Sequence, residues 1–300
     1  MIYTLTISPA IDYVMHVDEL IPGATNRSQQ EEYYFGGIGI NVSVILQNLG
    51  LPSKALGFTA GFTGKALEEG LHEQGVDTDF IHLKDGITRI NVKLKAGLET
   101  EINGQGARPT DEDLRLLEER FEKMGEGDMI IISGSIPKGL PEDTYEKLLT
   151  IAVSRGATPV VDTNGQLLVN TLKHKPFLIK PNHDELKDLF GEDITPIEGA
   201  RKLQEMGARN VIISLGKEGA VMLSEDGGEY SCGIAKGKVL NTVGSGDSMV
   251  AGFIAGYEQS HDYQHALNMG GAAGSATAFT PGLASREMIE SCLAQLEEKK

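Results

Sequence analysis

Short apolar segments alternate with segments of helical periodicity over residues 110–214, and this alternation constrains the fold more than any other feature of the chain. The apolar segments, such as residues 129–132, have the length of buried strands, and the segments between them place apolar residues on one helical face. Strands that alternate with helices in this way form parallel sheets covered by helices on both faces. We therefore predict an α/β fold with a parallel sheet flanked by helices.

Two segments interrupt the alternation and show the period-two pattern of strands. Residues 12–35 contain short alternating pieces and a Pro22-Gly23 turn, and residues 86–105 contain two alternating runs around Ala96-Gly97, which indicates a hairpin. We expect the two segments to pair into one small sheet that covers a cleft as a lid. The predicted organisation is a core formed by residues 1–11, 36–85 and 106–300, with a lid formed by residues 12–35 and 86–105.

The composition is typical of a globular protein with an acidic surface. Hydrophobic residues make up 40% of the chain and charged residues 23%, and the formal net charge is −16. Phosphate backbones and anionic membranes attract surfaces rich in Lys and Arg, so this charge argues against nucleic acid or a membrane as the main partner. The N-terminus lacks a signal-peptide pattern, and no run of about 18 apolar residues occurs. Because Cys232 and Cys292 have no metal-type spacing, we expect a cytoplasmic protein with reduced thiols.

Polar, glycine-containing turns follow most of the predicted strands. Ligands of parallel α/β sheets bind beyond the carboxyl ends of the strands, so these turns are expected to line one cleft. Asp12 and Asn41 lie near the ends of the first strand–helix units of the chain. The later turns span residues 133–138, 162–165, 180–185 and 214–219. Each turn alone is more typical of a loop or a helix cap, but together on one edge of a sheet they favour a cleft.

The stretch most suggestive of chemistry is residues 241–256, where Gly244, Ser245 and Gly246 lead into Asp247 and then into a helix. Glycines allow backbone conformations with positive φ, so successive N–H groups can point at one anion, and a helix N-terminus adds a positive field. A carboxylate beside an anion site suits the proton acceptor of a phosphoryl transfer. The same residues also fit a glycine-rich turn in which Asp247 is an ordinary helix cap.

Two common nucleotide-binding motifs are not found. A P-loop requires Gly-x-x-x-x-Gly-Lys-Ser/Thr, and the nearest candidate, at Gly64-Lys65, has Thr59 in place of the first glycine and Ala66 in place of the hydroxyl residue. A dinucleotide fingerprint requires Gly-x-Gly-x-x-Gly, and the glycine pairs at 37 and 39 and at 244 and 246 both lack the third glycine. A dehydrogenase is therefore not expected.

Three motifs together resemble the PfkB, or ribokinase-like, family of sugar kinases. They are Gly-Gly-Ile-Gly-Ile-Asn at residues 36–41, Lys-Pro-Asn-x-x-Glu at 180–185 and Asn-Thr-Val-Gly-Ser-Gly-Asp-Ser at 241–248. The resemblance covers essentially the whole chain and implies a ribokinase-like fold whose β lid also forms a homodimer interface. Further traits, such as Thr-Arg-Ile-Asn-Val-Lys at 88–93, are similar to members that act on phosphorylated ketoses.

The resemblance implies a kinase that uses ATP and Mg²⁺ to phosphorylate the C6 hydroxyl of fructose 1-phosphate, giving fructose 1,6-bisphosphate. Asp247 would be the general base, and the N–H groups of Gly244, Ser245, Gly246 and Asp247 would stabilise the transferring phosphoryl group. Mg²⁺ would be held by Asn182 and Glu185. The nucleotide would contact Lys180, Asn182, Ser214, Gly216, Gly219 and Gly246, and the sugar would contact Asp12, Gly37, Asn41, Ser135 and Lys138.

Arg27 and Arg89 are the expected ligands of the phosphate that the acceptor already carries, because guanidinium groups pair bidentately with phosphate oxygens. Both lie in the predicted lid, so binding would close it and exclude water. Relatives usually carry a lysine and an arginine where this chain has Ile38 and Val44. This departure leaves two alternatives open. One is tagatose 6-phosphate or another sugar as the acceptor, and the other is a sugar-phosphate sensor without catalysis.

Overall fold

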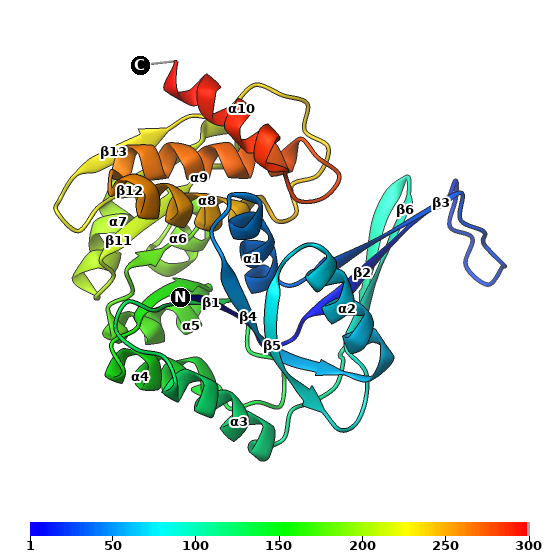
Figure 1. Ribbon diagram of the computed structural model, residues 1–300. Helices are drawn as coiled ribbons and strands as arrows, with labels where there is room; N and C mark the ends of the chain where they lie inside the picture. The colour runs from blue at the N-terminus through cyan, green and yellow to red at the C-terminus, as the bar shows by residue number, and fades with distance from the viewer. Residues whose placement is uncertain (299–300) are drawn as a thin grey trace.

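A computed structural model describes residues 1–298 as two sheets surrounded by helices (Figure 1). In the larger sheet β1, β4, β5, β8, β9, β10 and β11 run parallel to one another, whereas β12 and β13 extend one edge in antiparallel orientation. The expected α/β fold is confirmed, with the difference that the sheet is mixed. In spatial order its strands are β13 (Glu229–Cys232), β12 (Ala220–Leu223), β11 (Asn210–Ser214), β10 (Leu178–Ile179), β9 (Thr158–Asp162), β8 (Met129–Ser133), β1 (Ile2–Thr6), β4 (Ser53–Ala60) and β5 (Asp77–Leu83).

The smaller sheet joins the two β segments that interrupt the alternation, so their expected pairing is confirmed. Within it β2 and β6 run parallel, and the β6–β7 hairpin turns at Gly97, whose φ of 74° favours glycine. Figure 1 shows this sheet extending to one side of the core. Its order is β3 (Gln30–Gly36), β2 (Ala10–His16), β6 (Arg89–Ala96) and β7 (Leu98–Asn103).

Helices cover both faces of the larger sheet, as the alternation predicts. One face packs against α1 (Ile38–Asn48), α8 (Ser245–Ser260), α9 (Tyr263–Ala278) and α10 (Arg286–Glu297). The other face packs against α3 (Asp111–Glu122), α4 (Thr144–Ser154), α5 (Gly165–Thr171), α6 (His183–Phe190) and α7 (Pro196–Glu205). Helix α2 (Gly61–Glu73) packs beside Phe35 and so joins the small sheet to the core. Within the described chain, no helix combines the length and apolar character that a membrane crossing requires.

Two elements of the core, β5 and α5, have weak sequence patterns. Strand β5 begins with polar residues and buries its side chains irregularly, as an edge strand can. Helix α5 has seven residues, which is too short for a periodic pattern. By contrast, helix α3 begins with a clear local signal, a capping box in which Thr110 is the N-cap and Asp113 takes the position usually held by Glu or Gln.

Gly57 allows β1 and β4 to lie side by side at the end of the sheet that faces the cleft. Its φ is 148°, and a Cβ atom would lie 1.9 Å from the carbonyl oxygen of Thr6. Because alanine would add both steric overlap and backbone strain, we expect Gly57→Ala to lower the free energy of unfolding by about 3 kcal/mol or more.

Urea titration measures this change. Gly125→Ala is the matched control, since a Cβ atom there would meet nothing within 4 Å. Equal stabilities of the two variants would show that the β1–β4 contact tolerates a side chain.

Candidate active site

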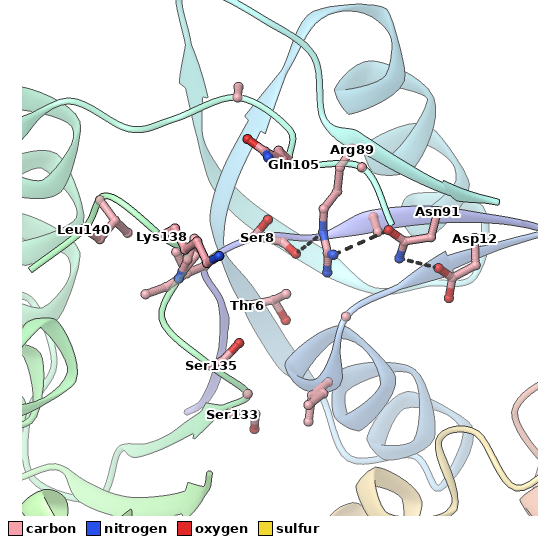
Figure 2. Close-up of a pocket in the computed structure, with 18 of the residues that line it drawn as sticks. Thr6, Ser8, Asp12, Arg89, Asn91, Gln105, Ser133, Ser135, Lys138 and Leu140 are labelled. Carbon is pink, nitrogen blue, oxygen red and sulfur yellow. Dashed lines mark hydrogen bonds between the residues drawn. The ribbon is translucent and has the colours of Figure 1, made fainter. Parts of the chain in front are cut away.

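A cavity of about 660 Å³ lies between the carboxyl ends of β1 and β8 and the polar face of the small sheet. Its other walls are the first turn of α1, residues 104–109, residues 133–140 and the turn before α8. Figure 2 shows side chains from these segments pointing into one space. The cleft expected at the carboxyl edge of the sheet is therefore present, and the small sheet borders it.

Glycines hold the first turn of α1 close to β1. Gly37 has a φ of 139°, and a Cβ atom at this position would lie 2.5 Å from Cγ2 of Thr6. At Gly39 a Cβ atom would lie 2.6 Å from a backbone oxygen of β1. The N–H group of Ile40 donates to Oγ1 of Thr6 at 3.0 Å. This close contact places the side chain of Asn41 in the cavity wall.

Asp247 lies in the first turn of α8 and reaches the same cavity. Its Oδ2 accepts a hydrogen bond from Nδ2 of Asn41 at 2.7 Å. Gly244 precedes the helix in the left-handed conformation, with a φ of 79°. A side chain there would be strained, so glycine is required for the turn that directs Asp247 into the cavity.

Of the four N–H groups that the sequence suggests as an anion site at the start of α8, one is already paired with a backbone oxygen. The N–H of Ser245 donates to the carbonyl oxygen of Thr242 at 3.2 Å. The N–H groups of Gly244 and Gly246 have no backbone acceptor in residues 1–298, whereas that of Asp247 interacts with its own carboxylate. Unpaired N–H groups at a helix N-terminus attract anions, so those of Gly244 and Gly246 are available to a ligand.

The pKa of Asp247 is raised from its ordinary value of 3.8 to about 6. Burial is the main cause, and the negative charge of Asp162 adds to it. The hydrogen bond from Asn41 and the positive charge of Lys180 act in the opposite direction. Asp247 is therefore ionised at neutral pH, yet it is a stronger base than an ordinary aspartate.

Lys180 places a buried positive charge beside this helix start. Its side chain is 9% exposed, and Nζ lies 3.4 Å from Oδ1 of Asp162. A Cβ atom at Gly246 would lie 3.2 Å from the same Nζ. Burial alone would lower the pKa of Lys180, but the carboxylates of Asp162, Asp247 and Glu185 outweigh it and raise the pKa. The ammonium group is therefore charged and lies against the proposed anion site.

Three cationic side chains line other walls of the cavity. They are Arg89 on β6, Arg108 in the segment after β7, and Lys138 in the segment after β8. Nε of Arg89 donates to the carbonyl oxygen of Ser8 at 3.2 Å. Figure 2 shows Arg89 and Lys138 entering the cavity from different segments. Such a group of cations can bind a phosphate group.

Most of the residues expected from sequence to contact the sugar lie together here. Those that line the cavity are Asp12, Gly37, Asn41, Arg89, Ser135 and Lys138, together with Gly244 and Asp247. Arg27 does not join them. It lies exposed between β2 and β3, outside the cavity of this chain. Arg89 lies in a strand and Arg27 in a loop beyond it, so the two do not meet in the cavity of this chain, and the expected role of Arg27 stays a prediction.

Asn182 and Glu185 have a structural role that the motif did not reveal. They form a capping box at the start of α6, in which Oδ1 of Asn182 accepts from the N–H of Glu185 at 2.9 Å. Oε2 of Glu185 accepts from the N–H of Asn182 at 2.8 Å. A parallel bridge places Ser214 beside Asn182, and the turn from Gly216 to Gly219 follows. Residues 1–298 contain no cluster of three or more His, Cys, Asp or Glu side chains suited to a metal ion.

Three residues at the site were not singled out from the sequence. Asp162 pairs with Lys180, Asn91 donates to Asp12, and Arg108 lines the cavity. A signal existed for Asp162, which begins one of the polar turns after a strand. Arg108 had no such signal, since it lies in a segment of irregular structure.

The sequence comparisons agree in the type of protein they identify. The model of the pfkB family of carbohydrate kinases matches residues 1–289. The 1-phosphofructokinase of Bacillus subtilis is 44% identical over 301 residues, which cover 99% of both chains. The D-tagatose-1-phosphate kinase of Bacillus licheniformis is 36% identical over 304 residues and also covers 99% of both. That relative is named for the 1-phosphate of tagatose, whereas the sequence-based alternative was the 6-phosphate.

Solved structures show the same fold. Phosphofructokinase-2 from Escherichia coli in complex with fructose-6-phosphate has a TM-score of 0.89, 29% identity and coverage of 99% of both chains. Another structure is described as the tetrameric inhibited form of that protein, with a TM-score of 0.88, 28% identity and 99% coverage of both. Ribokinase from Thermotoga maritima, at 22% identity, matches with a TM-score of 0.79 over 97% of this chain and 98% of its own, which confirms the ribokinase-like fold.

The environment of Asp247 predicts how stability depends on pH. Its pKa is about 6 in the folded chain and near 3.8 when exposed, so the folded state binds the proton more tightly. The stabilisation from this proton is present below pH 4 and is lost as the pH rises through 6. Asp247→Asn should therefore gain stability relative to the wild type between pH 4 and pH 7, by at most about 3 kcal/mol.

Urea unfolding of both proteins at pH 4.5 and pH 7.5 measures the difference. Equal m-values would show that both unfold in the same way. A stability difference that does not change with pH would contradict the raised pKa.

Proposed function

The chain belongs to the pfkB family of carbohydrate kinases, and on that premise we propose that it transfers the γ-phosphoryl group of ATP to the C6 hydroxyl of fructose 1-phosphate. The observation that carries this proposal is one cavity with a buried carboxylate, Asp247, on one wall and the cations Arg89, Arg108 and Lys138 on others. Its volume suits a small phosphorylated sugar.

Fructose 1-phosphate fits a cavity with a carboxylate on one wall and cations on others, because its phosphate and its reacting hydroxyl are at opposite ends of the molecule. In our proposal Arg89, Arg108 and Lys138 bind the phosphate, and Asp12 and Asn41 bind ring hydroxyls. Arg89 is already oriented by the carbonyl oxygen of Ser8, so little side-chain freedom is lost on binding.

Asp247 is proposed to act as the general base. As the C6 oxygen attacks the γ-phosphorus, its proton passes to the Asp247 carboxylate, and the bond to the ADP oxygen breaks. Asn41 keeps the carboxylate in place through Oδ2. The N–H groups of Gly244 and Gly246 and the Lys180 ammonium stabilise the charge on the transferring group.

The nucleotide is proposed to lie along Lys180, Ser214 and the Gly216–Gly219 turn. Mg²⁺ would neutralise charge on the ATP phosphates when bound. Asn182 and Glu185 fit a role in holding it through water, because Mg²⁺ prefers oxygen ligands and usually retains several water molecules. Their capping box also fixes both side chains, which favours a preformed site.

A coupled assay of ADP release tests the proposal. We expect kcat/KM to be highest for fructose 1-phosphate, followed by tagatose 1-phosphate. Tagatose 6-phosphate and fructose 6-phosphate should be poorer, and free fructose should be at least about 100-fold poorer because the cations would remain unpaired. Asp247→Asn should lower kcat by about 100- to 10,000-fold and leave the KM for ATP nearly unchanged.

The possible outcomes separate the parts of the proposal. Turnover of free fructose that equals that of the phosphorylated sugars would refute the phosphate site. Substantial activity of Asp247→Asn would refute the base. Ligand binding without ADP production would favour the sensor that the sequence left open.

We also propose that the small sheet is a homodimer interface. Tyr13, Tyr33, Val92 and Ile102 are in register across the four strands and share one face, away from Asp12 and Asn91. Tyr33 is 64% exposed and Ile102 60%, which is unusual for large apolar side chains in a row. A second copy of the same sheet would cover them.

The buried free thiols Cys232 and Cys292 also support a cytoplasmic location.

Replacing Tyr33 and Ile102 together with aspartate should convert a dimer into a monomer, since two buried charges per chain would oppose association. Sedimentation velocity measures the mass. Val153→Asp, which changes an exposed side chain on α4, is the control and should leave the mass unchanged. A wild-type monomer would refute the interface.

A further inference from the structure

Asn91 connects two polar groups of the cavity and has no part in the reaction described above. Its Nδ2 donates to Oδ1 of Asp12 at 2.7 Å, and its Oδ1 accepts from Nη1 of Arg89 at 3.4 Å. Figure 2 shows these bonds as one chain that continues from Arg89 to the carbonyl oxygen of Ser8. The side chain therefore links the guanidinium group to the carboxylate.

Strand register produces this arrangement. β2 and β6 pair in parallel with Asp12 opposite Asn91, and Arg89 lies two residues earlier on the same face of β6. Asn91 is 8% exposed, so its amide has little freedom to turn away. Nζ of Lys93 lies 4.0 Å from Oδ2 of Asp12 and restrains the other carboxylate oxygen.

We propose that Asn91 is a positioning residue that fixes the Asp12 carboxylate relative to the Arg89 guanidinium, and that this fixed spacing makes the cavity select ketose 1-phosphates over ketose 6-phosphates. The inference rests on the proposed function, in which Arg89 binds the phosphate of the acceptor and Asp12 binds a ring hydroxyl.

The chemistry of the acceptor explains why such a spacing matters. Fructofuranose has a CH₂O arm at both ends, so either arm can carry the phosphate while the other is phosphorylated. The ring carbon beside the phosphate arm bears a hydroxyl in fructose 1-phosphate (C2) and a hydrogen in fructose 6-phosphate (C5). A carboxylate at a fixed distance from the phosphate therefore meets different hydroxyl patterns in the two sugars. A site built to bond a hydroxyl rejects an analogue that does not present one there.

The test compares kcat/KM for fructose 1-phosphate and fructose 6-phosphate in the wild type and in Asn91→Leu. We expect the ratio between the two sugars to fall by at least about tenfold in the variant, because a small loss of alignment has a large effect on a near-attack geometry. The KM for ATP should not change. Asn103→Leu is the matched control, since Asn103 lies opposite Asn91 on β7 and outside the cavity.

A second variant keeps the proposal testable if leucine disturbs folding. Asn91→Asp retains an acceptor for Arg89 but loses the donor to Asp12, so at pH 8 it should lower the ratio in the same direction. Thermal melting of each variant reports whether it is folded.

A double-mutant cycle separates positioning from a general structural effect. Arg89→Lys and Asp12→Asn should be non-additive in kcat/KM for fructose 1-phosphate when Asn91 is present. In the Asn91→Leu background they should be additive within about twofold. An unchanged ratio in both Asn91 variants, or coupling that persists without Asn91, would overturn the inference while leaving the proposed function intact. A wild type that does not use fructose 1-phosphate would instead overturn the proposed function.

Discussion

The buried positive charge of Lys180 constrains the arrangement of the active site. An ammonium group is stable away from water only when carboxylates lie beside it, so the positions of those carboxylates are restricted. Asp162 supplies one of them at 3.4 Å, and this contact follows from topology. Strands β9 and β10 are adjacent and parallel, so the residues at their carboxyl ends leave the sheet at the same edge. Asp247 arrives at this edge from α8. The pKa of Asp247 is raised by burial and by the negative charge of Asp162, so the carboxylate that pairs with Lys180 also makes Asp247 a stronger proton acceptor.

In the small sheet, the strand register gives the two faces different characters. Asp12 and Asn91 lie opposite each other on the face towards the cavity, while Tyr13, Tyr33 and their neighbours lie on the other face. A shift of one residue between β2 and β6 would exchange the two sets. The polar wall of the cavity and the exposed apolar face, which we propose as a dimer interface, therefore depend on the same strand pairing.

The sequence predicted the parts of the site that depend on local pattern. The glycine turn before Asp247 and the polar ends of parallel strands have a local signature, and the structure places them at one cavity. Arg27 and Arg89 were predicted on the same ground, as guanidinium groups in the lid segments. Whether a residue of the lid reaches the cavity depends on strand length and loop position, which the local sequence does not give. The motif at Asn182 and Glu185 was read as a metal site, and its second role as a capping box follows from the same spacing. Arg108 could not be predicted as a cavity residue, because this depends on the path that residues 104–109 take in the folded chain.

Ile38 illustrates how a departure from the usual motif can be accommodated. It lines the cavity near Gly134 and is 36% exposed, so a lysine at this position would have room to reach the ligand. Arg89, Arg108 and Lys138 already provide positive charge for one phosphate group. A further ammonium on α1, beside Asn41, would also favour the ionised form of Asp247 and lower its pKa. In the proposed function, isoleucine therefore preserves the basicity of Asp247, and cations on the other walls of the cavity bind the phosphate.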